Sequence, residues 1–271
     1  MKKCFLVILI VLLSLVVLLP FTYAAKLSDE DIAKKKEGWY PTGLPLVNYD
    51  SDNGFGYGVR VYMYNNGSRD EENFAYAPYK MQLYGQFYQT TNGYQYHEVN
   101  LDMPYIMGTK FRVITSVAYD KKINANFFGI GADRAKEKLT MDTEGSDGII
   151  KFDKYEDYVD YADDNDDLQK YYNYRYTKPS FFLNIHRDLT QNLKILIGVE
   201  VKKVDIDAWD GHKFDHDRQG PTLLEQWQPE GYDGGWSNFV RAGIYYDTRD
   251  YEPDPKTGYL IDYAYEISDN V

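Results

Sequence analysis

The sequence comprises 271 residues with 44% hydrophobic content, which suits one large folded domain or two small ones. Its aromatic fraction of 17% is high, and 28 residues are tyrosines, whose apolar rings and polar hydroxyls suit interfaces, membrane interfaces included. The formal net charge of −12 opposes binding to nucleic acid.

The N-terminus has the organisation of a cleavable secretory signal peptide. Lys2 and Lys3 form a positive start, an apolar run covers residues 5–19, and a small-residue cleavage site follows at 22–24. An uncleaved membrane anchor is the alternative, but the run is shorter than the roughly 20 residues of a spanning helix. Cleavage would remove Cys4, the one cysteine, and leave no thiol for a disulfide, a metal or nucleophilic chemistry.

Alternation of apolar and polar residues predicts about nine β-strands. In residues 55–63, for example, Val59 and Val61 alternate with Gly58 and Arg60. Several strands exceed the usual length of about five or six residues and match the roughly 9–11 residues of a strand that crosses a bilayer. The predicted strands are 43–49, 55–66, 79–90, 94–106, 111–127, 172–189, 193–207, 238–249 and 259–268.

One face of these strands carries charged side chains. Such groups are costly in a dry core but tolerated in a water-filled lumen, so they favour a membrane barrel. A soluble β-sandwich, or a wide soluble barrel of a secreted binding protein, is the alternative and shows similar alternation. The charged residues are Arg60, Glu98, Arg112, Lys194, Glu200, Arg241, Asp262 and Glu266.

The connections alternate in length as those of an outer-membrane barrel do, with short periplasmic turns and longer external loops. If the first strand rises from the periplasm, the turns at 107–110, 190–192 and 251–258 face the periplasm. The long acidic segments at 130–171 and 208–237 then face outward. The connection at 67–78 departs from the rule, because it would be a long periplasmic turn.

The segment from residue 238 to 268 predicts two strands around a turn. Pro253 fixes φ in the turn, and Gly258 permits the positive φ that a tight reversal needs. Asp247, Arg249 and Asp250 lie at the strand end, where they can pair and cap the turn.

This hairpin resembles the Tyr-Asp-Thr-Arg-Asp…Pro…Gly hairpin of the bacterial surface antigen family, the BamA- and TamA-type outer-membrane assembly barrels. Two further segments match in family order: residues 44–65 resemble the opening barrel hairpin, and residues 126–133 resemble a glycine-containing segment after a later strand. The residues that carry the resemblance, all with structural roles, are Gly243, Tyr246, Asp247, Arg249, Asp250, Pro253 and Gly258 in the hairpin, and Gly54, Gly56, Gly58, Gly129 and Gly131 elsewhere.

The resemblance implies an all-β protein of the bacterial outer membrane: an antiparallel transmembrane β-barrel after a cleavable signal peptide. The expected domains are a signal peptide at 1–24, a short periplasmic segment at 25–42, and a partial barrel at 43–271. The family barrel has more strands and follows periplasmic POTRA domains. About nine strands and no space for such a domain therefore indicate an incomplete barrel in a truncated member.

The resemblance further implies a role in inserting or translocating polypeptides at the outer membrane, through strand pairing at a weak lateral seam. The expected partners are outer-membrane lipid and either other outer-membrane polypeptides or a second chain that completes the barrel. Two alternatives stay open. One is a structural or passive-transport barrel with acidic external loops, and the other is a membrane anchor for a separate enzyme.

No sequence pattern indicates enzymatic chemistry, so no catalytic residue, cofactor or metal is expected. The chain has no Gly-x-Ser-x-Gly motif. His212 and His216 have a spacing that could bind a metal on a helix, but the polar, glycine-flanked segment favours an exposed loop. The acidic run from Asp160 to Asp167 lacks the glycine and the terminal glutamate of an EF-hand loop.

Overall fold

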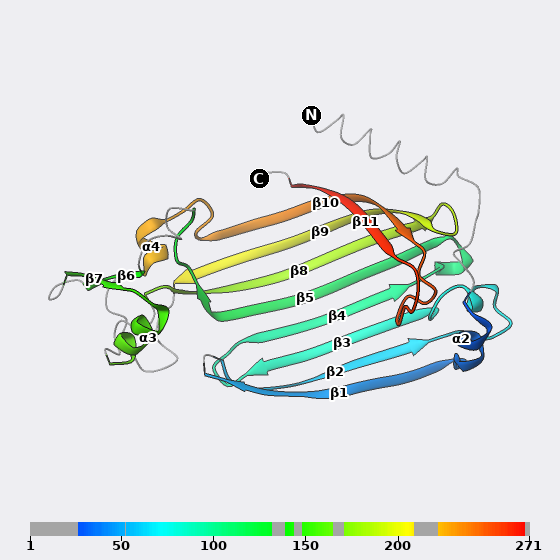
Figure 1. The fold of residues 1–271 in the computed structure, drawn as a ribbon, viewed down its shortest axis with the longest axis horizontal. Coiled ribbons are helices and arrows are strands. Elements are labelled where there is room, and N and C mark those ends of the chain that lie inside the picture. Colours follow the sequence, from blue (N-terminus) through cyan, green and yellow to red (C-terminus); the bar gives the residue numbers. More distant parts are fainter. Residues whose placement is uncertain are drawn as a thin grey trace.

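The computed structural model describes residues 27–51, 53–131, 139–143, 148–164, 171–208 and 222–268. A nine-stranded antiparallel sheet dominates, in the order β1-β2-β3-β4-β5-β8-β9-β10-β11 (Figure 1). Its strands are β1 (Trp39–Asp50), β2 (Gly54–Asn65), β3 (Met81–Thr90), β4 (Gln95–Met103), β5 (Phe111–Asn126), β8 (Asn173–Asp188), β9 (Leu193–Ala208), β10 (Gly234–Asp247) and β11 (Leu260–Ser268).

All nine predicted strands are confirmed, and most ends agree within two residues. β1 and β10 begin earlier than expected, at Trp39 and Gly234, because glycine and proline at their starts read as loop in the sequence. The predicted signal peptide and the pair of histidines lie outside the described residues. Among the residues that are described, no helix is both long and apolar enough to cross a membrane.

Short elements fill the connections. A separate two-stranded sheet pairs β6 (Leu139–Thr143) with β7 (Gly148–Phe152). The helices are α2 (Asp29–Lys34), α3 (Tyr155–Asp164) and α4 (Leu223–Trp227), together with the 3-10 turns η1 (Glu72–Ala75) and η2 (Ile106–Gly108).

The main sheet has an apolar outer face and a polar inner face. Side chains alternate along each strand, so the predicted lumenal charges share the inner face and the hydrophobic residues between them share the outer face. A soluble sandwich would bury this apolar face, whereas here it stands exposed across the sheet, as in a lipid-facing barrel wall. Its exposed residues include Val47, Val59, Leu83, Phe87, Val99, Val117, Phe181, Ile185, Val199, Ile244 and Tyr263.

The two longest connections, β5–β8 and β9–β10, lie at one end of the sheet, as the sequence predicts, together with the short β1–β2 and β3–β4 turns (Figure 1). The other end has the β4–β5 and β8–β9 turns and also the longer β2–β3 and β10–β11 connections, the second of which the sequence predicts as a short turn. The long-loop end carries β6, β7, α3 and α4. There Phe152, Tyr158, Tyr171, Tyr172 and Leu223 form a small buried hydrophobic cluster. The short-turn end carries α2, the β4–β5 and β8–β9 turns, and the connection from β10 to β11.

The β2–β3 connection is long because it is half of a folded unit. Arg69, from this connection, donates hydrogen bonds to the carbonyl oxygens of Ile32 at 3.2 Å and Lys35 at 3.1 Å, at the end of α2. In return, Lys35 Nζ donates to the carbonyl oxygens of Phe74 at 2.7 Å and Ala77 at 2.8 Å, at the end of η1. Each segment thus satisfies carbonyls that the other's helix leaves unpaired.

The partly buried ammonium group of Lys35 predicts that the stability of this unit depends on pH in the alkaline range. Burial lowers the pKa of Lys35 from its ordinary value of 10.5 to about 8. Between these two values the folded state binds fewer protons than the unfolded state, so the unit should become more stable as pH rises through this window. Hydrogen exchange of the α2 amides, corrected for intrinsic rates, should slow accordingly.

The Lys35→Met variant tests the assignment of this pH dependence, with Lys36→Met as the neighbouring control. In the Lys35→Met variant we expect the stability of the unit no longer to increase with pH. In the Lys36→Met variant we expect the increase to remain. A rise that persists in Lys35→Met would contradict the role of the buried ammonium.

β1 is an edge strand whose free edge is interrupted by two prolines. The hydrogen bond from Asn66 N to Gly38 O, at 2.9 Å, fixes the alternation, so even-numbered residues of β1 turn their N–H groups towards β2. The N–H groups of odd-numbered residues point to the free edge, where Pro41 and Pro45 have none. Within the described ranges β1 pairs with β2 alone and β11 with β10 alone, so the sheet is open.

Candidate functional site on the inner face

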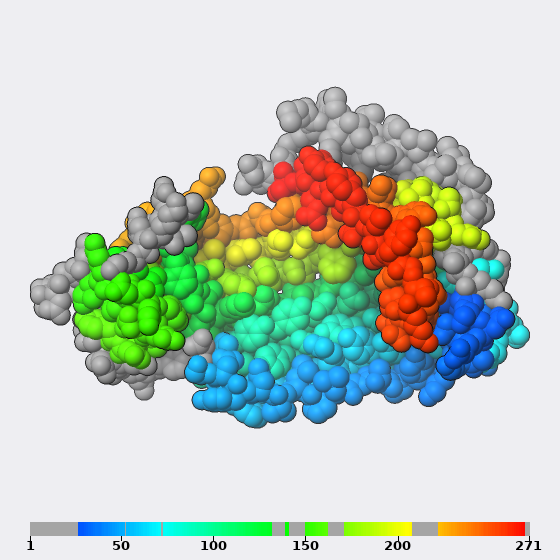
Figure 2. Space-filling view, viewed as in Figure 1, coloured from blue at the N-terminus to red at the C-terminus, as the bar shows by residue number. Residues whose placement is uncertain are grey.

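The connection between β10 and β11 folds back over the inner face of the sheet, and we call residues 248–259 the strap (Figures 1 and 2). Asp250 organises it. Its Oδ1 accepts hydrogen bonds from three backbone N–H groups, those of Thr257 at 3.1 Å, Lys256 at 2.9 Å and Tyr251 at 3.0 Å. These donors, Thr257 foremost, hold the pKa of Asp250 below its ordinary value.

Replacing Asp250 with alanine should loosen the strap without disturbing the sheet. The amides of Lys256 and Thr257 lose their acceptor, so their hydrogen exchange should become several-fold faster. Asp254→Ala is the matched control, because Asp254 lies in the same strap and accepts no such bond among the described residues. Equal hydrogen-exchange rates of these amides in the Asp250→Ala and Asp254→Ala variants would show that Asp250 does not hold the strap.

Gly258 and Arg249 shape the base of the strap. Gly258 has φ of +88°, and a Cβ there would lie 2.3 Å from the carbonyl oxygen of Thr248, so only glycine fits. Arg249 donates from Nε and Nη2 to the two carboxylate oxygens of Asp247, each at 2.9 Å. The predicted capping pair is therefore present at the end of β10.

The other predicted hairpin residues lie around this base. Gly243 lets β11 approach closely, because a Cβ there would lie 2.9 Å from the carbonyl oxygen of Tyr263. Tyr246 lies on the outer face, with its ring centroid 6.0 Å from that of Tyr259. Pro253 lies within the strap itself.

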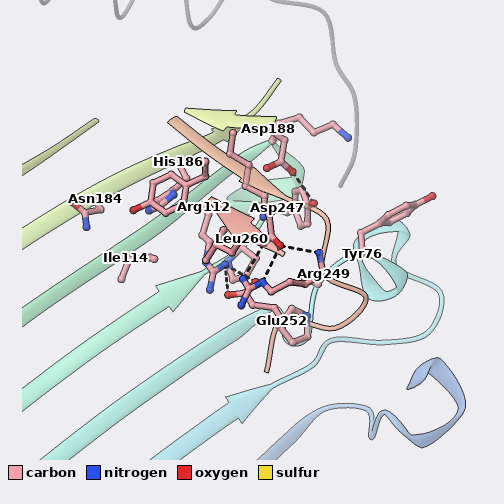
Figure 3. A pocket seen from close by; sticks show the side chains of 17 residues that line it. Tyr76, Arg112, Ile114, Asn184, His186, Asp188, Asp247, Arg249, Glu252 and Leu260 are labelled. Carbon is pink, nitrogen blue, oxygen red and sulfur yellow. Dashed lines mark hydrogen bonds and ion pairs between the residues drawn. The ribbon is translucent and has the colours of Figure 1, made fainter. Parts of the chain in front are cut away.

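Arg112, near the start of β5, ties the strap to the sheet (Figure 3). Its Nε and Nη2 donate to the two carboxylate oxygens of Asp102 on β4, at 2.8 and 2.6 Å. Its Nη1 donates to both carboxylate oxygens of Glu252 in the strap, at 2.8 and 2.9 Å. The Arg112 and Asp102 side chains are 19% and 8% exposed, so this ion pair is largely removed from water.

Tyr79 completes the network, which we call the lock (Arg112, Asp102, Glu252 and Tyr79). Its hydroxyl donates to Asp102 Oδ2 at 2.7 Å. Burial raises the pKa of Tyr79 far above its ordinary value, so the phenol stays protonated and keeps its role as donor. The lock joins β4, β5, the β2–β3 connection and the strap.

A cavity of about 290 Å³ lies beside the lock, between the strap and the sheet (Figure 3). Its lining mixes cations and anions, among them Lys194 and Arg249 with Asp188 and Asp247, so neither sign of ligand charge is favoured. In the described part of the chain, no group of three or more metal-ligating side chains could hold an ion. The arrangement is that of a structural contact between the strap and the sheet.

The predicted glycines of the opening hairpin make room for atoms of β3 and of the β3–β4 turn. A Cβ at Gly56 would lie 2.0 Å from the Tyr88 hydroxyl oxygen, and a Cβ at Gly58 would lie 2.1 Å from the carbonyl oxygen of Phe87. Gly54 has φ of +75°, and its Cβ would lie 2.3 Å from Thr91 Oγ1.

Gly129 and Gly131 have a conformational role in the structure. They follow β5 with φ of +95° and +102°, values that other residues rarely adopt. These two glycines lie at the long-loop end of the sheet. The predicted hairpin residues around the strap lie at the opposite end, so the structure does not bring the two groups together.

Sequence reasoning missed most of the lock. It placed Arg112 on the inner face but assigned no role to Asp102, Glu252 or Tyr79. Asp102 and Arg112 lie on either side of the β4–β5 turn, and both have the alternation of inner-face residues. These two observations together could have predicted that the side chains pair. Glu252 had no such signal, because it lies 140 residues from Arg112 in a connection without periodicity.

These features define a class of protein: long antiparallel strands with an exposed apolar outer face and a charged inner face form the wall of an outer-membrane β-barrel. Residues 79–271, most of the chain, match the model of the Omp85 superfamily domain. The chain therefore belongs to the Omp85 superfamily, which includes the BamA/TamA-type barrels that its motifs resemble and implies a bacterial outer-membrane location.

Residues 18–80 match a second model, a domain of unknown function (DUF5982). The described part of this region contains α2, β1, β2 and η1, and so includes both the capped unit and the edge strand with its two prolines. No curated protein matches the chain.

Proposed function

We propose that this protein helps to insert or translocate polypeptides at the bacterial outer membrane by pairing a client strand with the free edge of β1. The observation that carries the proposal is the edge itself, which presents backbone carbonyl and N–H groups that β2 does not use. Such groups are costly to leave unpaired in lipid, and an added strand satisfies them. Membership of the Omp85 superfamily supports this role.

Pro41 and Pro45 make this edge a weak seam. A client strand paired along β1 forgoes two hydrogen bonds, each with a net value of about 0.5–1.5 kcal/mol. A client can therefore pair and still leave. This mechanism uses backbone pairing alone and needs no catalytic residue, cofactor or metal.

The proposed partners follow from the two faces and the edges. Outer-membrane lipid covers the apolar outer face. The edge of β1 pairs with a client polypeptide or with a second chain that completes the barrel. The short-turn end, with the strap and the capped unit, faces the periplasm, and the long loops face outward.

Depletion followed by complementation tests the proposal. Depletion should lower the amounts of other outer-membrane barrel proteins, and the unaltered chain should restore them. The Val47→Pro/Tyr49→Pro variant should not, because both residues are odd-numbered and the substitutions remove further free-edge donors while the bonds to β2 stay. Unchanged barrel levels on depletion, with ion conductance in a planar bilayer, would favour a passive pore instead.

A further inference from the structure

A second cavity, of about 590 Å³, opens on the inner face towards the long-loop end of β1–β4, apart from the lock. Figure 2 shows the inner face lying open between the strap and the long-loop end. An aromatic ring forms part of the lining. Tyr88 lies across the position where Gly56 has no side chain, and its hydroxyl hydrogen-bonds to the side-chain oxygen of Asn48 on β1.

Further tyrosines extend this aromatic surface. The ring of Tyr94 meets that of Tyr88 edge-on, with centroids 5.8 Å apart. Towards the short-turn end, Tyr84 and Tyr62 follow with centroids 4.9 Å apart, and Tyr62 and Tyr64 with centroids 5.9 Å apart. Half-buried tyrosine rings therefore line the inner face from the cavity towards the lock.

Side chains beside these rings have hydrogen-bond donors that the structure leaves available to a ligand. Gln86 Oε1 accepts from Arg60 Nε and from the Tyr84 hydroxyl, each at 2.8 Å, which occupies both of its lone pairs. The Gln86 amide nitrogen has no acceptor among the described residues. The Arg60 guanidinium contacts Gln86 and the Tyr84 hydroxyl but has five N–H donors, more than these two partners use. The lining also contains Asp50 and Asn53.

We propose that this groove binds a free saccharide. A sugar ring has a face of C–H groups that packs on a flat aromatic ring and an edge of hydroxyls that both donate and accept hydrogen bonds. The groove offers both complements, half-buried tyrosine rings and planar amide, guanidinium and carboxylate groups. An apolar ligand would cover the Gln86 amide nitrogen without offering it an acceptor, which opposes its binding.

The tyrosine surface further fits a chain of sugars. Tyr94 and Tyr88 lie at the cavity with centroids 5.8 Å apart. Tyr84, Tyr62 and Tyr64 form a second run further along the inner face, with neighbouring centroids 4.9 and 5.9 Å apart, so sugar units at both places can meet an aromatic surface. The volume lies within the range of about 300–1,000 Å³ for small-molecule sites, which also occur in the mouths of β-barrels. This binding is independent of client-strand pairing at β1.

Isothermal titration calorimetry of the full chain in detergent tests the proposal, with maltohexaose, cellohexaose and hexagalacturonate as probes at millimolar concentration. At least one hexasaccharide should bind, and Tyr88→Ala should weaken it roughly tenfold. Tyr88→Phe keeps the ring and should retain most of the affinity. Absence of binding by all three probes would overturn the proposal.

Two further variants make the result specific. Arg60→Met should weaken binding by removing donors while keeping the volume of the side chain. Tyr57→Ala is the matched control, because Tyr57 lies on the opposite face of β2 and should leave binding unchanged. Equal losses in Tyr57→Ala and Tyr88→Ala, or binding of lipopolysaccharide but of no free oligosaccharide, would overturn the assignment.

Discussion

Replacing Arg112 with alanine is expected to lower the free energy of unfolding by roughly 3–5 kcal/mol and to free the strap. The substitution leaves the buried Asp102 carboxylate without its cation, and removal of one partner from a buried ion pair has this cost. Urea unfolding followed by tryptophan fluorescence measures the first effect. Faster hydrogen exchange of residues 248–259 measures the second.

Arg241→Ala is the matched control for this prediction. Arg241 also lies on the inner face and pairs with a carboxylate, Glu266, but the two side chains are 31% and 42% exposed. We therefore expect a loss of no more than about 1 kcal/mol. A similar loss in Arg112→Ala and Arg241→Ala would contradict the lock.

Glu252→Gln separates the strap contact from the rest of the lock. It keeps a hydrogen-bond acceptor but removes the charge, at a side chain that is 34% exposed. The expected effect on unfolding is small, while the strap should exchange faster than in the unaltered chain. A double-mutant cycle of Arg112→Ala with Glu252→Ala then gives the coupling between sheet and strap.

Replacing Pro41 and Pro45 with valine is expected to strengthen the seam at β1. The substitutions add two N–H donors to the free edge, and two net hydrogen bonds correspond to about 1–3 kcal/mol. A photo-crosslinking amino acid in place of Val47 should capture client strands in roughly tenfold higher yield. Release of the client should slow, so the stronger edge should reduce the rate of assembly.

The Thr42→Val/Leu44→Val variant is the control for the seam. Both residues are even-numbered, so their N–H groups already face β2 and the change adds no donor to the free edge. We expect the crosslinking yield to stay at the level of the unaltered chain. If both double variants raise the yield equally, strand propensity explains the effect and the seam interpretation fails.

The sequence predicted the sheet well because alternation is a local signal. Residues such as Val59 and Arg60 report their opposite faces within a few positions, and each strand repeats the pattern. The exceptions, at Trp39 and Gly234, are strand starts where pairing with a neighbour overrides weak local propensity. The small elements at the long-loop end carried no periodic pattern and were predicted only as loops.

The candidate site was less accessible to sequence analysis. Asp250 and Gly258 could be assigned to a turn, since turn chemistry is local. The direction in which that turn folds depends on Arg112, which is far away in sequence and close only after the sheet has formed. Proline within a strand is typical of an edge strand. That Pro41 and Pro45 both lack a donor on the free edge follows only from the hydrogen-bond alternation, which the structure supplies.

The lock has a consequence for the order in which the chain folds. Most strands of the sheet pair with their neighbours in sequence, so hairpins can form one after another with little loop entropy to overcome. The contact between Arg112 and Glu252 instead spans 140 residues. It forms only when the β10–β11 hairpin is in place, and so belongs to the last steps of folding. Until then, Arg112 and Asp102 remain hydrated beneath an uncovered inner face, and closure of the strap marks the completion of this part of the wall.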